Sequence, residues 1–149
     1  MLVVRRRLSI TLTGLLLAPL LGRMGAARAQ PAAHGKPHRV VIQVSDADPA
    51  KWALALNNAS NIQQDLGADQ VAIEIVAYGP GIGLLKLESV LEARISEAIA
   101  AGGSVQACEN TMRNQKMVQG DMLPGIGYVP SGVVQLMKRQ KEGWAYIRP

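Results

Sequence analysis

One stretch decides the predicted fold: Val105-Gln106-Ala107-Cys108-Glu109-Asn110-Thr111-Met112, which holds the only cysteine of the 149-residue chain. The apolar run that ends at Cys108 is typical of a buried strand, and Asn110 and Thr111 are residue types that favour the start of a helix. A thiol at such a junction faces backbone N–H groups and the positive end of a helix dipole, and both favour the thiolate. We therefore predict that Cys108 is a reactive or sulfur-carrying thiol.

Strands and helices alternate on both sides of this stretch. Strands are expected at 39–44, 71–77, 104–108, 128–129 and 144–147, and helices at 51–66, 84–101, 110–118 and 133–141. Near-continuous apolar strands are typical of parallel sheets whose two faces are both covered. The pattern predicts an α/β fold, a three-layer α/β/α domain with a mainly parallel five-stranded sheet.

Two of the expected helices have clear boundary signals. Asp48 and Pro49 are an N-cap and a first helical residue, and Gly67 is placed to end that helix. The helix expected at 84–101 has an apolar face with helical spacing and ends at two glycines. That face is made of Leu84, Leu87, Leu91, Ile95 and Ala98.

Ligands of open parallel sheets bind beyond the carboxyl ends of the strands. Four loops leave the predicted sheet there, so one edge gathers acids, a glycine-rich turn, the thiol and hydroxyl groups. Besides Cys108, the candidate ligand residues are Ser45, Asp46, Tyr78, Gly79, Gly81, Asn110, Thr111 and Ser131. Asp46 and Asp48 are also open to interpretation as an acid pair or half of a metal site, but a capping role for Asp48 is favoured.

Two other patterns do not support a cofactor or metal site. The run Gly79-Pro80-Gly81-Ile82-Gly83 has the spacing G-x-G-x-G, and Pro80 removes an N–H that a phosphate needs, so a plain tight turn is favoured. His34 and His38 lie in a segment rich in proline and glycine, where nothing fixes their geometry. We expect no metal and no cofactor.

The surroundings of Cys108 limit its chemistry. No histidine is placed as a base, which argues against a cysteine-protease arrangement, and no second cysteine exists for a C-x-x-C pair. Arg113 and Lys116 in the next two turns favour a thiolate, whereas Glu109 opposes one. A thiol that accepts and passes on persulfide sulfur is compatible with these limits. The alternative is a structural cysteine in the core.

The first 29 residues have the three parts of an export signal. Arg5-Arg6-Arg7 is a charged start, Leu8 to Leu21 is an apolar core, and Ala27-Arg28-Ala29 is a cleavage site that makes Gln30 the mature start. The apolar core is shorter than the roughly 20 residues of a comfortable membrane span, so we expect no stable membrane span after cleavage. We predict a periplasmic protein exported by the general secretory or the twin-arginine route, with a flexible lead-in at 30–38 and a domain at 39–149.

The charge of the mature chain argues against nucleic acid as a partner. Five of the 16 basic residues and none of the 11 acidic residues lie in the leader, so 11 of each remain. The five aromatic residues are too few for a base-stacking surface.

The sequence resembles the DsrE/DsrF-like family over about 39–149. The resemblance rests on five stretches in this order: Val40-Val41-Ile42-Gln43-Val44-Ser45, Leu56-Asn57-Asn58-Ala59 with Leu66-Gly67, Val76-Ala77-Tyr78-Gly79-Pro80-Gly81, Ala107-Cys108-Glu109-Asn110-Thr111-Met112, and Glu142-Gly143-Trp144-Ala145-Tyr146-Ile147-Arg148-Pro149. It implies a small three-layer α/β/α fold and assembly into oligomers.

The resemblance also implies a function. In the DsrE/DsrF/TusD sulfur-relay group, a cysteine after the third strand carries persulfide sulfur between proteins, and Cys108 matches that position. The relay proteins act in the cytoplasm, so the exported branch of the family is the closer match. We hypothesise a periplasmic sulfur carrier or sulfurtransferase-like protein that forms a homo-oligomer and exchanges sulfur with a donor or acceptor protein. The alternative is a non-enzymatic binding or assembly module with a structural Cys108.

Overall fold

The computed structural model describes residues 35–149, and the proposed export signal and His34 lie outside this range. The described part is built on a sheet of five strands in the order β4-β3-β2-β1-β5. Every neighbouring pair of strands is parallel, which confirms the predicted fold class. The strands are β1 (His38–Val44), β2 (Val71–Ala77), β3 (Ser104–Cys108), β4 (Gly127–Val129) and β5 (Ala145–Ile147).

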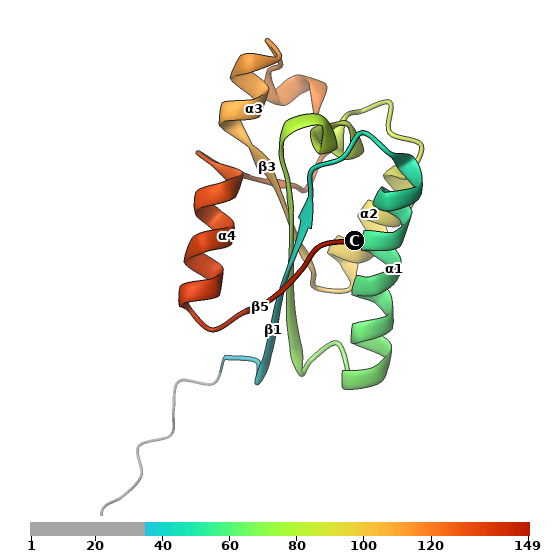
Figure 1. The fold of residues 1–149 in the computed structure, drawn as a ribbon. Coiled ribbons are helices and arrows are strands. Elements are labelled where there is room, and N and C mark those ends of the chain that lie inside the picture. Colours follow the sequence, from blue (N-terminus) through green and yellow to red (C-terminus); the bar gives the residue numbers. More distant parts are fainter. Residues whose placement is uncertain (1–34) are drawn as a thin grey trace, which may run out of the picture. The chain divides into compact units, whose positions relative to one another are not determined.

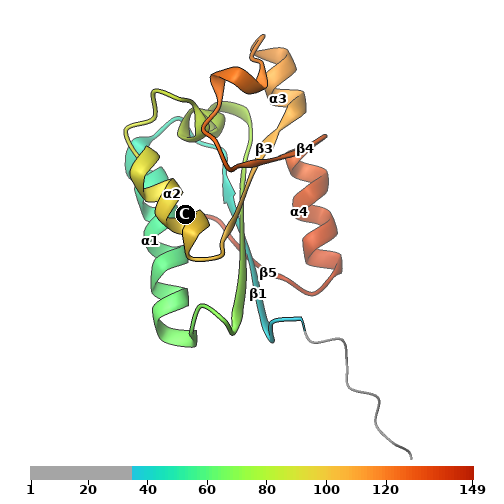
Figure 2. The same ribbon diagram turned by 180° about the vertical axis from the view of Figure 1, so that it is seen from behind.

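Helices cover both faces of this sheet, as Figures 1 and 2 show. One face carries α1 (Pro49–Leu66) and α2 (Glu92–Ala100), and the other carries α4 (Gly132–Lys141). The short helix α3 (Glu109–Asn114) lies beyond the carboxyl end of β3. The loops that leave β1, β2, β3 and β4 therefore meet at one edge, where the candidate site was expected.

The start of α1 shows what Asp48 does. Its side chain accepts a hydrogen bond of 2.9 Å from the N–H of Ala50, with Pro49 as the first helical residue. Gly67 follows the helix with φ of +91°, a conformation that glycine adopts without strain. Asp48 is thus a helix cap, as the sequence favoured.

The prediction of one helix over 84–101 was wrong. A 3₁₀ helix, η1 (Gly79–Leu85), precedes an extended Lys86, and α2 begins only at Glu92. Leu84 and Leu85 are both fully buried, while Leu87 is exposed. The segment is fixed by partners distant in sequence: the Leu123 N–H donates to the Leu85 carbonyl, the Leu87 N–H donates to the Asp121 carbonyl, and Lys86 pairs with Met122.

Gly81 holds η1 against the end of β1. Its N–H donates to the Ser45 carbonyl at 3.2 Å. A Cβ at this position would lie 2.4 Å from the Val44 carbonyl oxygen, closer than van der Waals contact permits. The backbone on both sides would have to move apart to admit any side chain.

We therefore expect Gly81→Ala to lower the free energy of unfolding by about 3 kcal/mol, through overpacking against backbone. Gly120→Ala is the matched control, because its added methyl group would meet only a Val118 methyl group at 4.0 Å. Urea unfolding of the two variants checks the difference. Equal midpoints would show that η1 is not packed this closely on β1.

The two faces of the sheet bury different amounts of apolar surface. Ile42, Ile75 and Val105 belong to the large core under α1 and α2. The core under α4 has only Val41, Val76 and Leu136 as fully buried members, with Tyr78 and Trp144 packed against it. Because neighbouring residues of a strand face opposite sides, Glu74 and Cys108 lie on the face that α4 covers.

Candidate functional site

Cys108 is the last residue of β3 and occupies the N-cap position of α3. The expectation that Asn110 and Thr111 cap this helix was wrong, because both lie inside its first turn. Cys108 is 4% exposed, so its sulfur is covered, whereas a thiol that exchanges sulfur with another protein has to be accessible to it. The placement at the carboxyl edge of the sheet agrees with the prediction.

Hydrogen-bond donors surround the sulfur despite its burial. The Gly132 N–H, at the first residue of α4, donates to Cys108 Sγ at 3.2 Å. Burial raises the pKa of the Cys108 thiol, but hydrogen bonds from the Thr111 hydroxyl and from the N–H groups of Gly132, Thr111 and Asn110 outweigh it. The net result is a pKa below that of an ordinary thiol.

Thr111 connects the sulfur to the loop after β2. Its Oγ1 accepts a hydrogen bond of 2.9 Å from the Gly79 N–H, which leaves the hydroxyl hydrogen free to point at Cys108. The Gln115 amide, one turn further along, donates to the Gly79 carbonyl at 3.3 Å. The loop after β2 and helix α3 thus hold the Thr111 hydroxyl in place beside the thiol.

Tyr78 and Gly132 form the other wall. A Cβ on Gly132 would lie 2.9 Å from the Cβ of Tyr78, so these two segments of the chain approach so closely that only a glycine fits at position 132. The Asn110 N–H donates to the Pro130 carbonyl at 3.2 Å and ties α3 to the loop before α4. Of the predicted site residues, Asn110 and Thr111 lie at the sulfur of Cys108, and Tyr78 and Gly79 contact its partners Gly132 and Thr111.

The loop after β1 adjoins this group through the backbone, because the Tyr78 N–H donates to the Val44 carbonyl at 3.1 Å and the Gly81 N–H donates to the Ser45 carbonyl at 3.2 Å. The Ser45 hydroxyl accepts a hydrogen bond of 2.9 Å from the Gln43 amide. Asp46 lies 3.4 Å from the Lys51 ammonium and 3.8 Å from the Arg148 guanidinium. None of these side chains is among the hydrogen-bond partners of the sulfur, so Ser45, Asp46 and Gly81 supply no hydrogen bond to Cys108.

Ser131 stands at the N-cap position of α4, and its side chain makes no capping hydrogen bond. The Arg113 guanidinium donates to the Asn110 side chain instead of reaching the sulfur. The lowered pKa of Cys108 therefore comes from hydrogen bonds and not from the cations that the sequence suggested.

Two residues that matter here, Gly132 and Glu74, were not predicted from the sequence. Gly132 donates to the sulfur, and its signal was a small residue directly after the Pro130-Ser131 turn. Glu74 is 1% exposed in the middle of β2. A lone charge inside the apolar run of 71–77 was its signal, because a charged residue is almost never fully buried without a partner.

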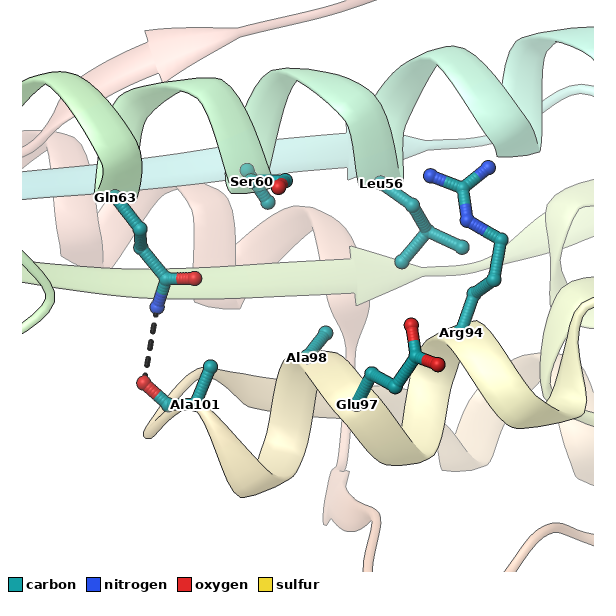
Figure 3. Close-up of a pocket in the computed structure, with 8 residues that line it drawn as sticks. Leu56, Ser60, Gln63, Arg94, Glu97, Ala98 and Ala101 are labelled. Atoms are coloured by element: carbon teal, nitrogen blue, oxygen red, sulfur yellow. Dashed lines mark hydrogen bonds between the residues drawn. The ribbon is translucent and has the colours of Figure 1, made fainter.

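A groove of about 180 Å³ lies elsewhere, between α1 and α2. Figure 3 shows Arg94 reaching from α2 toward α1, and the Gln63 amide donates to the Ala101 carbonyl at 3.1 Å. The Arg94 guanidinium donates to the Asn57 side chain at 2.7 Å. The lining residues include no cysteine or histidine, and the groove is on the face of the sheet opposite α4.

Within residues 35–149, no helix is long and apolar enough to cross a membrane. The same range contains no group of three or more histidine, cysteine, aspartate or glutamate side chains arranged to hold a metal ion.

Comparison with known proteins gives a family match and similar structures. Residues 38–149 match the model of the DsrE/DsrF-like family. A solved structure of a protein of unknown function from Methanobacterium thermoautotrophicum is 39% identical, with a TM-score of 0.72 over 75% of this chain and 99% of that one. No curated protein matches this chain significantly.

Two more distant structures share the fold. A conserved protein of unknown function from Bacteroides thetaiotaomicron is 15% identical with a TM-score of 0.59, over 74% of this chain and 94% of that one. The ychN protein from E. coli is 11% identical with a TM-score of 0.59, over 75% of this chain and 99% of that one. At these identities, the likeness shows the architecture alone.

Proposed function

The chain belongs to the DsrE/DsrF-like family, and from this premise we propose that it carries sulfur as a persulfide on Cys108 in the periplasm. Membership suggests a function related to sulfur relay. The observation that supports the finer proposal is the sulfur of Cys108 itself, which accepts the Gly132 N–H bond and has a lowered pKa in a covered position. Thiolate is the form that attacks sulfur.

The proposed transfer needs no oxidant or reductant. The Cys108 thiolate attacks the outer sulfur of a donor persulfide R–S–SH, a new S–S bond forms, the donor's S–S bond breaks, and R–S⁻ leaves. An acceptor thiolate then attacks the outer sulfur of the Cys108 persulfide, and the Cys108 thiolate is the leaving group. A low pKa of Cys108 increases the fraction of thiolate available as the nucleophile and makes the Cys108 thiolate a better leaving group.

Burial places a condition on this chemistry. Since Cys108 is 4% exposed, the donor sulfur reaches it only when the segment 130–132 or the first turn of α3 moves aside. Val133, Val134 and Met137 are exposed on α4, the helix that begins with the Gly132 donor. This apolar surface fits a protein partner, either a second copy in a homo-oligomer or a sulfur donor or acceptor protein.

Loading of the mature protein with sulfur tests the proposal. After incubation with a low-molecular-weight persulfide, the intact mass is expected to rise by one sulfur atom, and cyanide is expected to remove that atom as thiocyanate. A protein that stays unmodified under conditions that load a free thiol peptide contradicts the proposal. N-terminal sequencing of the exported protein checks the predicted start at Gln30.

The burial of Cys108 favours a second function, a binding or assembly module in which the thiol only packs and accepts hydrogen bonds. Labelling with iodoacetamide without denaturant separates the two functions. A thiolate of lowered pKa that is reached by brief opening is labelled near neutral pH by the folded protein. Labelling only after unfolding favours the assembly module.

A further inference from the structure

We propose that Glu74 is a positioning residue, whose buried carboxylate holds α4 in the place where the Gly132 N–H meets the Cys108 sulfur. The inference rests on the proposed use of Cys108 and adds the residue that fixes its hydrogen-bond donor. Glu74 lies in the middle of β2, on the face that α4 covers, and is 1% exposed.

The carboxylate of Glu74 holds two side chains of α4. Its Oε1 accepts a hydrogen bond of 2.6 Å from the Gln135 amide. Its Oε2 accepts two more from the Arg139 guanidinium, at 3.0 Å from Nε and 2.6 Å from the terminal nitrogen. Gln135 and Arg139 are one turn apart, so they lie on the same side of the helix. One carboxylate thus fixes both the position and the rotation of α4.

Apolar packing contributes little to holding α4 on the sheet, so the carboxylate of Glu74 has to fix its position. Leu136 is the only large side chain of α4 that is fully buried, and Val133, Val134 and Met137 are exposed. A helix held by so little apolar surface gains little from burial alone. The Arg139 guanidinium is itself held, because it lies 4.6 Å from the centre of the Trp144 ring and donates to Glu142 at 2.9 Å.

The hydrogen bonds of Glu74 to Gln135 and Arg139, here called the clamp, lie a short distance along the chain from Gly132, the donor to the sulfur. Gln135 is three residues from Gly132, and its N–H donates to the Ser131 carbonyl at 3.0 Å in the first turn of α4. Upstream, the Pro130 carbonyl accepts from the Asn110 N–H. Glu74 on one side and Asn110 on the other therefore set where the Gly132 N–H points.

The effect of Glu74 on the thiol has a sign that separates positioning from direct electrostatics. Removing the negative charge of Glu74 would by itself stabilise the Cys108 thiolate and lower its pKa. Loss of the Gly132 hydrogen bond would raise the pKa. The other ionisable groups on the elements around Cys108 are Tyr78, Glu109, Arg113, Tyr128, Lys138, Arg139 and Lys141, and the substitutions below leave all of them in place.

The experiment measures the rate of iodoacetamide labelling of the folded protein against pH in Glu74→Gln. We expect labelling near neutral pH to be about three- to tenfold slower than in the wild type. The midpoint of the curve of labelling rate against pH is expected to shift to higher pH. The rates of the two proteins are expected to converge at high pH, where the thiol is ionised in both. Greater exposure of the sulfur through loosened structure would instead speed labelling at every pH.

Two further variants complete the test. Gln135→Ala removes the tie nearest Gly132 without changing a charge and keeps the ion pair, so it is expected to shift the midpoint upward even if Glu74→Gln does not fold. Glu142→Gln is the matched control, since it removes the 49% exposed carboxylate that also meets Arg139 and leaves Glu74 in place. It is expected to label like the wild type.

An unchanged or lowered midpoint in both Glu74→Gln and Gln135→Ala would overturn the inference, as would an equal upward shift in Glu142→Gln. Because labelling involves no persulfide, this result is separate from the sulfur-loading assay. If the protein loads sulfur but these variants show no shift, the proposed function stands and the positioning role of Glu74 is wrong. A protein with the shift but without loading loses the proposed function alone.

Discussion

Cys108→Ser is expected to lose all cyanide-labile sulfur while it keeps the fold. A serine hydroxyl is not ionised near neutral pH and does not attack a persulfide without a base to activate it. The hydroxyl still accepts the Gly132 N–H bond, which is 3.2 Å long with the native sulfur. We therefore expect the free energy of unfolding to change by only about 1 kcal/mol.

Cys108→Ala is the informative partner of this variant. The alanine side chain accepts no hydrogen bond, so the buried Gly132 N–H loses its acceptor at a cost of about 1–3 kcal/mol. Both variants are expected to be unable to carry sulfur, but only the alanine variant is expected to unfold at clearly lower denaturant. Intact mass after persulfide treatment and urea unfolding give the two readouts. Sulfur bound equally to Cys108→Ser would place the carrier atom elsewhere and end the proposal.

Local signals in the sequence were sufficient for the positions of the strands along the chain and for their parallel direction. The strand of 71–77 was predicted with the bounds that β2 has, and Asp48 was identified as the cap that it is. Both depend on neighbours in the chain: apolar runs for the strand, and a carboxylate two residues before the N–H that it caps.

The missed features depend on partners distant in sequence. The residues 84–91 have helical spacing, yet Leu85 and Leu87 are bonded to Leu123 and Asp121, which no local pattern indicates. In the same way, the sulfur of Cys108 meets an N–H that is 24 residues away. The sequence placed Cys108 on the correct edge because parallel strands align their carboxyl ends, but the donors depend on how α4 is seated on the sheet.

Thr111→Val tests the other donor of the site and is expected to make the thiol less acidic. Valine has nearly the same shape as threonine but no hydroxyl, so Cys108 loses a hydrogen bond and the Gly79 N–H loses its acceptor at 2.9 Å. We expect the pKa of Cys108 to rise, which makes iodoacetamide labelling near neutral pH slower, by about tenfold. The unpaired Gly79 N–H is expected to cost about 1–3 kcal/mol of stability.

The stability of the wild type is expected to depend on pH through the ionisation of Cys108, because the hydrogen bond from Thr111 favours the thiolate. The pKa of Cys108 is lower in the folded protein than in the unfolded chain, so the folded state binds fewer protons between the two pKa values. The contribution of the thiolate is fully present above the unfolded pKa and is lost as pH falls through the folded pKa. The stability gap between wild type and Thr111→Val should therefore widen from neutral to alkaline pH.

Thr111→Ser is the matched control, because it keeps the hydroxyl and removes only a methyl group. It is expected to label at nearly the wild-type rate. Its stability gap to Thr111→Val is expected to widen from neutral to alkaline pH as that of the wild type does. The pH dependence of Cys108→Ser serves as the reference for the other titrating groups. If Thr111→Val and Thr111→Ser label alike, the hydroxyl does not act on the sulfur. The lowered pKa of Cys108 would then depend on the backbone N–H groups, of which the Gly132 N–H makes the direct contact.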